Sequence, residues 1–373
     1  MSTIILPPGF AANRRRLLGA AAAAFVPGLG LLSGCARQAE PVADTSGAAD
    51  TPAHQEVLAR LYERARAAGE RQVVLYTAFA GATPLWDVFN RRFPEVQVVP
   101  AQAAAASLFT RLSAEQRSGN HAGDVVLSGF SDMAELVRQG RLVAESPETA
   151  ADLPARFREP DEKYQLPWQN VFTVAYHTGL TEPSALPRSL DDLLDPAWRG
   201  RIVFPRLAGT SVSDVVLATL VNSGKFDDKS LHLLREHSRQ LEMSELVSGV
   251  AQGRIPFSVW TPAQSIALLA DSGAPVKSAF PPGVAVLFGP GVGLVERAPH
   301  PHAARLFKAW LFSAHGQDAI ARQLYSYGTI PGAPIPAGFP ALASYDQKDL
   351  PLADANRILS EFRQRTLAIW GQR

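Results

Sequence analysis

Four short segments place hydroxyl groups, glycines or aromatic rings directly after runs of apolar and β-branched residues. The candidate ligand contacts in these segments are Thr77 and Phe79, Ser128 and Gly129, Thr210 and Ser211, and Trp260 and Thr261. In open α/β sheets, ligands bind beyond the carboxyl ends of strands, where loops lead into helix starts. Hydroxyls beside free backbone amides suit an anion or a carboxylate, because the helix dipole points at the same place. The pattern predicts non-covalent binding of a small molecule.

Three further residues could extend such a site. Arg206 lies three residues before Gly209 and could add a charge-assisted hydrogen bond. Trp168 and Tyr327 could supply aromatic surface, which ligand pockets commonly use. The candidate hydroxyl and tryptophan residues also have a simpler interpretation, since Ser and Thr are common helix caps and buried Trp is common in cores. The spacing of Ser211 and Asp214 predicts a capping box.

Motifs that would indicate catalysis are missing from the sequence. It contains no Gly-x-Ser-x-Gly elbow, no P-loop and no His-Glu-x-x-His helix. His300 and His302 flank Pro301 at a predicted helix start, and we expect them to be structural or solvated rather than metal ligands. From these residues we expect no enzyme activity, no cofactor and no bound metal.

The elements that must position these residues alternate between short strands and amphipathic helices. The predicted strands are 73–76, 96–99, 124–128, 201–204, 255–260 and 292–295. The predicted helices are 84–93, a helix from Ser131 to Gly140, one opening at Thr210 or Ser211, and 301–313, 316–325 and 352–369. This alternation is typical of an α/β protein with largely parallel sheets.

The N-terminal region predicts export and lipid attachment. A basic cluster, Arg14 to Arg16, precedes a short apolar stretch that is broken by Pro27, as in a secretory signal. Leu32-Ser33-Gly34-Cys35 resembles the lipobox of bacterial lipoproteins, which predicts a signal peptide over 1–34, lipidation of Cys35 and a tether over 35–53. The arginines also resemble a twin-arginine signal, with general secretion as the alternative.

Charge and cysteine content exclude other classes of protein. Removing residues 1–34, which hold three arginines and no acidic residue, changes the net charge from +1 to −2. Such near-neutrality argues against a nucleic-acid partner. Cys35 is the single cysteine, so the protein has no internal disulfide and its stability depends on a hydrophobic core.

Several segments, taken in order, resemble the substrate-binding proteins of ABC importers. The substrate-binding proteins that these segments resemble form the extracellular solute-binding family, which includes ferric-ion, phosphonate, thiamine and polyamine binders. The matching segments are 73–79, 123–128, 193–202, 289–295, 298–304 and 327–332. The resemblance implies a two-lobed α/β periplasmic-binding-protein fold of type II, with two mixed sheets flanked by helices and joined by strand hinges. It places 54–168 and 290–373 in the first lobe and 169–289 in the second.

The resemblance also implies a function and a location. We expect a monomeric protein that captures a small organic or oxyanionic solute and delivers it to an ABC permease and ATPase, from the periplasm or the cell surface. Ferric binders of this family carry adjacent tyrosines after the strand that corresponds to 255–259, where this chain has Ser258-Val259-Trp260-Thr261. Ferric-ion binding therefore stays an alternative, as does a ligand sensor or an enzyme on the same scaffold.

Overall fold

The computed structural model describes residues 48–103, 105–209, 211–345 and 350–371. The predicted signal peptide, the lipidation site Cys35 and most of the predicted tether lie outside these ranges. The tether prediction extended to residue 53, but helix α1 (Pro52–Ala67) already begins at Pro52, with the Thr51 hydroxyl capping its first turn. None of the helices in the described ranges is long and apolar enough to span a bilayer.

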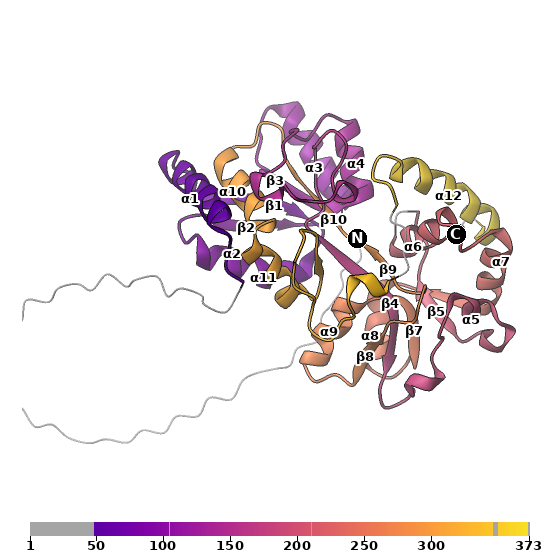
Figure 1. The fold of residues 1–373 in the computed structure, drawn as a ribbon. Coiled ribbons are helices and arrows are strands. Elements are labelled where there is room, and N and C mark those ends of the chain that lie inside the picture. The colour runs from indigo at the N-terminus through magenta and orange to yellow at the C-terminus, as the bar shows by residue number, and fades with distance from the viewer. Residues whose placement is uncertain (1–47, 104, 210, 346–349, 372–373) are drawn as a thin grey trace, which may run out of the picture. The chain divides into compact units, whose positions relative to one another are not determined.

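The first sheet consists of four strands in the order β10-β3-β1-β2 (Figure 1). Their bounds are β1 (Gln72–Thr77), β2 (Gln97–Gln102), β3 (Val125–Gly129) and β10 (Pro290–Leu294). Strands β2 and β3 both run parallel to β1, whereas β10 is antiparallel to β3. The sheet is therefore mixed, and its last strand comes from a part of the chain more than 150 residues away.

The second sheet is centred on the long strand β4 (Trp168–His177). Strands β7 (Phe257–Pro262), β8 (Val276–Ala279), β9 (Val286–Phe288) and β11 (Tyr327–Gly328) all pair antiparallel with β4. Parallel pairing in this region occurs between β5 (Ile202–Pro205) and β6 (Ser238–Leu241). The prediction of largely parallel sheets thus describes the first sheet better than the second.

Each sheet has its own helices and its own hydrophobic core. We call the body around the first sheet the first lobe; its helices are α1, α2 (Thr83–Arg92), α3 (Ala105–Ser118), α4 (Phe130–Arg138), α10 (Pro301–Leu311) and α11 (Ala314–Leu324). We call the body around β4 to β9 the second lobe; its helices are α5 (Leu190–Leu194), α6 (Val212–Asn222), α7 (Asp228–His237), α8 (Met243–Ala251) and α9 (Ala263–Asp271).

The chain crosses between the lobes through neighbouring strands. It leaves the first lobe through β4 and returns through β9 and β10, which are separated by Gly289. A Cβ atom at Gly289 would lie 1.7 Å from the Trp168 carbonyl oxygen, so only glycine fits at this approach. A third passage follows α11, where β11 pairs with the start of β4.

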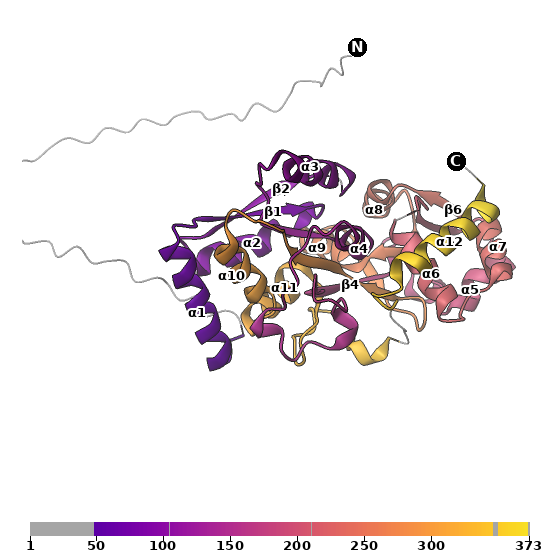
Figure 2. The ribbon, with the colours of Figure 1, turned by 90° about the horizontal axis from the view of Figure 1, so that it is seen from above.

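The C-terminal helix α12 (Ala355–Trp370) packs mainly on the second lobe, although it also contacts α4 of the first lobe, where the sequence predicted it. Residues 290–373 were assigned to the first lobe, but Ile358, Phe362 and Ile369 belong to the core that surrounds Phe204 and Trp260 in the second lobe. Figures 1 and 2 show α12 beside α6, and it also contacts α7. The apolar face of the helix was predicted correctly, but its assignment to the first lobe was wrong. Hydrophobic periodicity shows which face of a helix is buried, but not which part of the protein that face packs against.

A buried carboxylate fixes the start of the fold to the first lobe. The Asp50 side chain accepts hydrogen bonds from Arg92 Nη2 at 2.6 Å and from the His315 backbone N–H at 2.8 Å. Helix α1 then packs on α10 through Leu58, Leu61 and Ala65.

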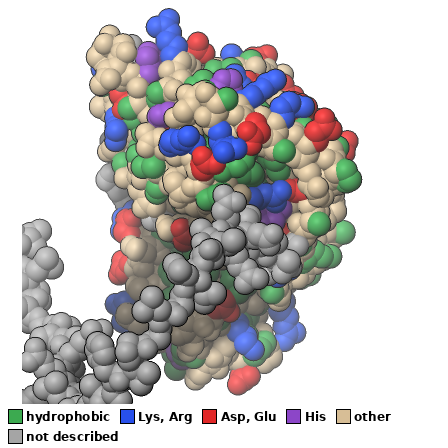
Figure 3. Space-filling view, turned by 90° about the vertical axis from the view of Figure 1, so that its left-hand side faces the viewer, with side chains coloured by type: hydrophobic (Ala, Val, Ile, Leu, Met, Phe, Trp, Pro, Cys, Tyr) green, Lys and Arg blue, Asp and Glu red, His purple; other side chains and the backbone are tan. Residues whose placement is uncertain are grey.

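Acidic and basic side chains are interspersed on the face of the molecule shown in Figure 3. Such mixing agrees with the absence of a strong net charge.

Candidate functional site

A cavity of about 1030 Å³ opens between the two lobes. Drug-sized and smaller ligands occupy pockets of roughly 300–1,000 Å³, so this volume admits a small organic molecule. The residues that line it are Ala78, Phe79, Gly81, Ala82, Trp168, Asn170, Glu242, Met243, Ser244, Val247, Ser248, Ala251, Gln252, Gln264, Ser265, Leu268, Leu269, Leu324 and Ser326. They come from both lobes and from the strand that connects them.

The first lobe contributes the turn that follows β1. The Thr77 hydroxyl accepts a hydrogen bond from the Phe79 backbone N–H at 3.0 Å, which holds the chain as it leaves the strand. The short 3-10 helix η1 (Ala80–Ala82) and then α2 follow. Phe79 is half-buried, and its ring meets the Trp168 ring edge-on at a centroid distance of 6.4 Å. These two predicted ligand contacts do line the cavity, whereas Thr77 is fully buried behind them.

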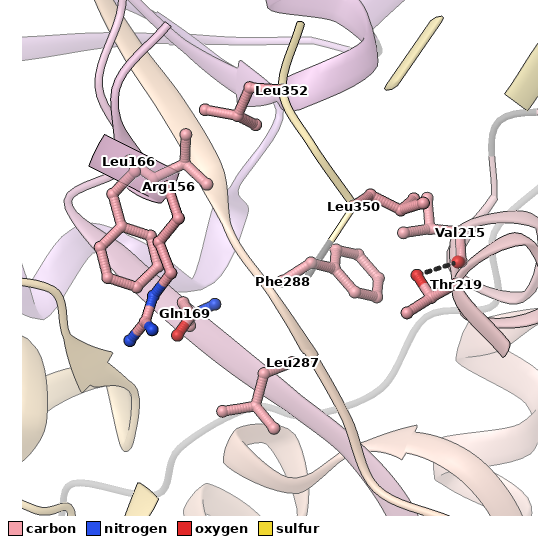
Figure 4. Close-up of a pocket in the computed structure, with 10 residues that line it drawn as sticks. Arg156, Leu166, Gln169, Val215, Thr219, Leu287, Phe288, Leu350 and Leu352 are labelled. Carbon is pink, nitrogen blue, oxygen red and sulfur yellow. Dashed lines mark hydrogen bonds between the residues drawn. The ribbon is translucent and has the colours of Figure 1, made fainter. Parts of the chain in front are cut away.

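The strand β4 forms the floor of the cavity and separates it from a second, much smaller one. Trp168 and Asn170 face the large cavity, while Gln169 lines a gap of about 20 Å³ with Phe288, Leu350 and Leu352 (Figure 4). Successive side chains of a strand point to opposite faces, which explains this division. The small gap is about the size of one water molecule, so the large cavity is the candidate site.

The second lobe contributes one side of α8 and one side of α9. Lining residues recur along α8 at Ser244, Val247, Ser248 and Ala251, which is the spacing of a single helix face. On α9 the Gln264 amide lines the cavity, and its Oε1 is buried without a hydrogen-bond partner. Buried acceptors are rarely left unpaired, so Gln264 is a ready acceptor for a ligand N–H or O–H.

The cavity carries little charge. Among its described lining residues, Glu242 alone is ionisable, and its Oε1 lies 2.5 Å from Arg206 Nε. Arg206 was predicted to contact an anionic ligand, but in the structure it pairs with Glu242 and does not line this cavity. The two side chains are 39% and 63% exposed, so the pair adds little stability and either partner remains accessible.

The end of β7 is closed, contrary to the prediction for Trp260 and Thr261. Trp260 is fully buried, packs edge-on against Phe204 and donates from Nε1 to the Val284 carbonyl at 3.1 Å. Its φ of 54° lies in the left-handed region, next to a register shift between β4 and β7. The Thr261 hydroxyl is hydrogen-bonded to the Ser258 hydroxyl at 2.6 Å. Both side chains belong to the core of the second lobe.

Three other predicted contacts also have partners within the protein. The buried Ser128 hydroxyl donates to Asp132 Oδ2 at 2.7 Å, and Gly129 caps α4. Ser211 forms the predicted capping box with Asp214, which is confirmed, and neither Ser128, Gly129 nor Ser211 lines the 1030 Å³ cavity. Thr210 lies outside the described residues.

Tyr327, a predicted ligand contact, does not line the cavity. Tyr327 is 1% exposed, and its hydroxyl contacts the Pro340 carbonyl at 2.5 Å and the Tyr345 hydroxyl at 3.0 Å, so it lies in a core. Burial raises the pKa of Tyr327 to about 12. Tyr325 is only partly buried, and its neighbours Leu324 and Ser326 line the cavity.

The described part of the chain contains no group of three His, Cys, Asp or Glu that could hold a metal ion. His300 has a structural role, as predicted, because its Nδ1 and its backbone N–H both contact the buried Asp124 carboxylate, at 2.9 and 2.8 Å. Burial raises the pKa of Asp124 above its usual value. The His302 backbone N–H is bound by Glu70. These contacts tie the start of α10 to the first sheet.

Sequence reasoning missed most of the cavity lining from α8 and α9. No bounds were predicted for either helix, although Met243 to Ala251 contains a run of helix-forming residues that ends before Gly253. Asn170 was also missed, although an amide in a strand of mainly apolar residues is a signal for a buried polar role. The lining of the second lobe comes from helix sides rather than from strand ends.

Comparison with known proteins gives the chain a family. Residues 74–318 match the bacterial extracellular solute-binding proteins. The chain is 23% identical to iron uptake protein A1 of Synechocystis over 93% of its own length and 97% of that protein. It is 24% identical to a probable ABC transporter periplasmic-binding protein of Sinorhizobium fredii, over 70% of its length and 74% of that protein.

Solved structures give the same result for the fold. Iron-bound HitA from Pseudomonas aeruginosa superimposes with a TM-score of 0.66 at 20% identity, covering 79% of this chain and 99% of HitA. The two-lobed α/β fold predicted from the sequence is therefore confirmed. With the match over residues 74–318, the chain belongs to the bacterial extracellular solute-binding protein family.

Proposed function

We propose that this protein is the solute-binding component of an ABC importer and that it holds its solute in the cavity between the lobes. The single observation that carries the proposal is that both lobes and the strand between them line one cavity of about 1030 Å³. Domain closure around a ligand is the motion of periplasmic binding proteins as a class. A solute that contacts both walls favours the closed arrangement, and the permease and ATPase then receive the loaded protein.

The lining supports a small organic solute. Phe79 and Trp168 offer aromatic surface, Ser244, Ser248 and Ser265 offer hydroxyls, and Gln264 offers an unpaired acceptor. Polar groups of this kind orient a neutral or weakly charged molecule without requiring it to lose a large hydration energy. An oxyanion finds less support here than the sequence suggested, because Arg206 is paired with Glu242 and does not itself line the cavity.

Ferric-ion transport is the second candidate, favoured by the names of the relatives, an iron uptake protein and iron-bound HitA. The described lining of the cavity includes no tyrosine, and the strand end at Trp260 and Thr261 is buried. A ferric site would therefore need ligands other than a pair of phenolates from that strand. Titration with ferric citrate separates the two candidates: iron that stays with the protein through gel filtration would favour iron transport, and protein that elutes without iron would favour the organic solute.

A thermal-shift screen tests the proposal directly. The panel contains phosphonates, phosphate esters, carboxylates, polyamines, thiamine and ferric citrate. Binding to the folded state stabilises it by about 2.7 kcal/mol at a hundredfold excess over Kd. We expect at least one compound to raise the melting temperature in proportion to the logarithm of its concentration. A panel that leaves the melting temperature unchanged would contradict solute capture in this cavity.

A matched pair of variants locates the site. Gln264→Leu removes the unpaired acceptor, and Gln97→Leu changes an exposed glutamine on β2, far from the cavity lining. We expect Gln264→Leu to weaken binding of the screened solute about five- to tenfold, as for one lost hydrogen bond, and Gln97→Leu to leave it unchanged. Equal affinities in the two variants would move the site elsewhere in the protein.

We also propose that the protein acts from the outer side of the cytoplasmic membrane, anchored through Cys35 as a monomer. The extracellular family supports the location, and the lipobox-like segment supports the anchor. A diacylglyceryl group together with a further acyl chain would hold the protein stably. Mass spectrometry of the N-terminal peptide should find lipid on Cys35, and Cys35→Ala should release the protein from the membrane fraction.

A solute-binding protein binds its solute without converting it, which distinguishes this proposal from an enzyme on the same scaffold. Among the described lining residues Glu242 is the one carboxylate, and no histidine or second acid accompanies it or the serine hydroxyls. A bound solute should therefore be recovered unchanged after prolonged incubation with the protein. Conversion of the solute at a rate that depends on Glu242 would replace the transport proposal with an enzymatic one.

A further inference from the structure

Tyr325 makes a direct contact between the two lobes at one end of the cavity. It follows α11, which packs on α2 and η1 in the first lobe. Its phenol O–H donates to Asp271 Oδ2, and Asp271 is the last residue of α9, which packs on β4 and β8 in the second lobe. Figure 1 shows α9 and α11 close together at the junction of the lobes. Leu324 and Leu268 beside this contact line the cavity.

The backbone at Tyr325 is held in an uncommon conformation. Its φ of 49° and ψ of 41° are left-handed and end α11 at Leu324. Glycine adopts this conformation freely at helix ends, whereas a residue with a bulky side chain adopts it at a cost. At this position the chain places a residue that offsets part of that cost with a hydrogen bond across the lobes. The contact between the lobes at this position is therefore made by the tyrosine side chain and not by the backbone turn.

The next residue makes a different kind of contact. The buried Ser326 hydroxyl donates to Asn170 Oδ1 at 2.8 Å, and Asn170 lies on β4, which connects the lobes. A connecting strand stays in place when lobes rotate about it, so the Ser326–Asn170 contact can persist at any degree of opening. The Tyr325–Asp271 contact joins the end of α11 in the first lobe to the end of α9 in the second lobe. Because the two lobes move apart when the cavity opens, this contact then breaks.

We propose that Tyr325 and Asp271 form a latch that positions the two walls of the cavity before the solute arrives. The latch favours the closed spacing in the solute-free protein, and its loss raises the fraction of open molecules. Because apparent affinity falls with the fraction of binding-competent molecules, the latch also tunes solute affinity. Only this last consequence rests on the proposed function; the effect on lobe spacing does not.

The test measures the distance between the lobes in the full chain without any solute. Spin labels are attached to cysteines introduced by Arg117→Cys on α3 and Lys229→Cys on α7, two exposed positions on different lobes, in a Cys35→Ala background. Pulsed electron spin resonance then gives the distance distribution. Tyr325→Phe and Asp271→Ala should each increase the ratio of open to closed molecules about threefold, as expected for one partly exposed hydrogen bond.

Two controls make the result specific. Tyr62→Phe removes a phenol that accepts from the Glu95 backbone N–H within the first lobe, and it should leave the distribution unchanged. The double variant Tyr325→Phe/Asp271→Ala should open the protein no further than either single change, because both remove the same contact. An unchanged distribution in both single variants overturns the latch, as does a double variant whose effect is the sum of the two. Neither outcome depends on finding a solute.

Discussion

The ends of β1 in the first lobe and β7 in the second were both predicted to contact the ligand, yet one is open to the cavity and the other is closed. After β1, Phe79 is half-buried and lines the cavity beside Trp168. Near the end of β7, Trp260 and Thr261 are fully buried and hydrogen-bonded within the second lobe. Both ends carry a hydroxyl and an aromatic ring, so residue type does not separate them. The difference teaches that the availability of a strand end depends on what packs over it.

The lobes also differ in how they satisfy buried polar groups. In the first lobe Lys308 on α10 is 1% exposed, and its Nζ donates to the Glu145 carbonyl at 2.6 Å. Burial disfavours the charged ammonium and lowers the pKa of Lys308 to about 7. The buried pair Ser258 and Thr261 in the second lobe is neutral at any physiological pH. The first lobe should therefore respond to pH more strongly than the end of β7.

The largest expected effect is on Trp260. Trp260→Ala should lower the free energy of unfolding by about 3–5 kcal/mol, because it leaves a cavity beside Phe204 and removes the bond to Val284. Urea denaturation of the solute-free protein measures this change. Phe79→Ala is the matched change at the open strand end and should cost clearly less. Equal losses would contradict the contrast between the two ends.

The second expected effect is the pH dependence due to Lys308. Between about pH 7 and its unfolded pKa of 10.5, Lys308 binds a proton in the unfolded chain but not in the folded one. The free energy of unfolding should therefore rise with pH in this window, by on the order of 1 kcal/mol per pH unit. Lys308→Met should remove this rise when both proteins are unfolded in urea from pH 7 to 9.5. Parallel pH profiles would show that Lys308 stays charged in the folded state.

The third effect concerns binding at the open strand end. With a solute found by thermal shift, Phe79→Ala should weaken binding about tenfold, which corresponds to roughly 1.4 kcal/mol. Trp260→Phe keeps an aromatic ring in the core and should change the affinity less than twofold. Isothermal titration of both variants gives the comparison. A reversed order of effects would place the solute at the end of β7.

The smallest effect is expected for the hydroxyl pair of β7. Ser258→Ala removes the partner of the buried Thr261 hydroxyl and should cost about 1 kcal/mol of stability, as for one hydrogen bond between neutral groups. Replacing both residues, as Ser258→Ala with Thr261→Val, should recover much of that loss. Solute affinity should stay the same in both variants. Weaker binding in either would restore Thr261 as a ligand contact.

The local elements were largely predictable. The predicted helix 84–93 corresponds to α2 (Thr83–Arg92), and the predicted strand 73–76 lies within β1. The capping box at Ser211 formed as expected, because its two partners are three residues apart. The predicted division of the lobes failed at α12, whose apolar face could have covered either core. Of the predicted ligand contacts, Phe79 and Trp168 line the cavity.

The sequence alone determined the order and type of most elements, their caps, the two-lobed family and the lack of an internal disulfide. Those features depend on side chains within a few residues of one another or on composition. Only the tertiary structure decided that Trp260 faces a core while Phe79 faces a cavity, that α8 and α9 form one wall, and that Tyr325 reaches Asp271. Burial and cross-lobe contacts depend on residues that are tens to hundreds of positions away in the sequence. A local sequence pattern does not specify which of those distant residues will pack against a given side chain.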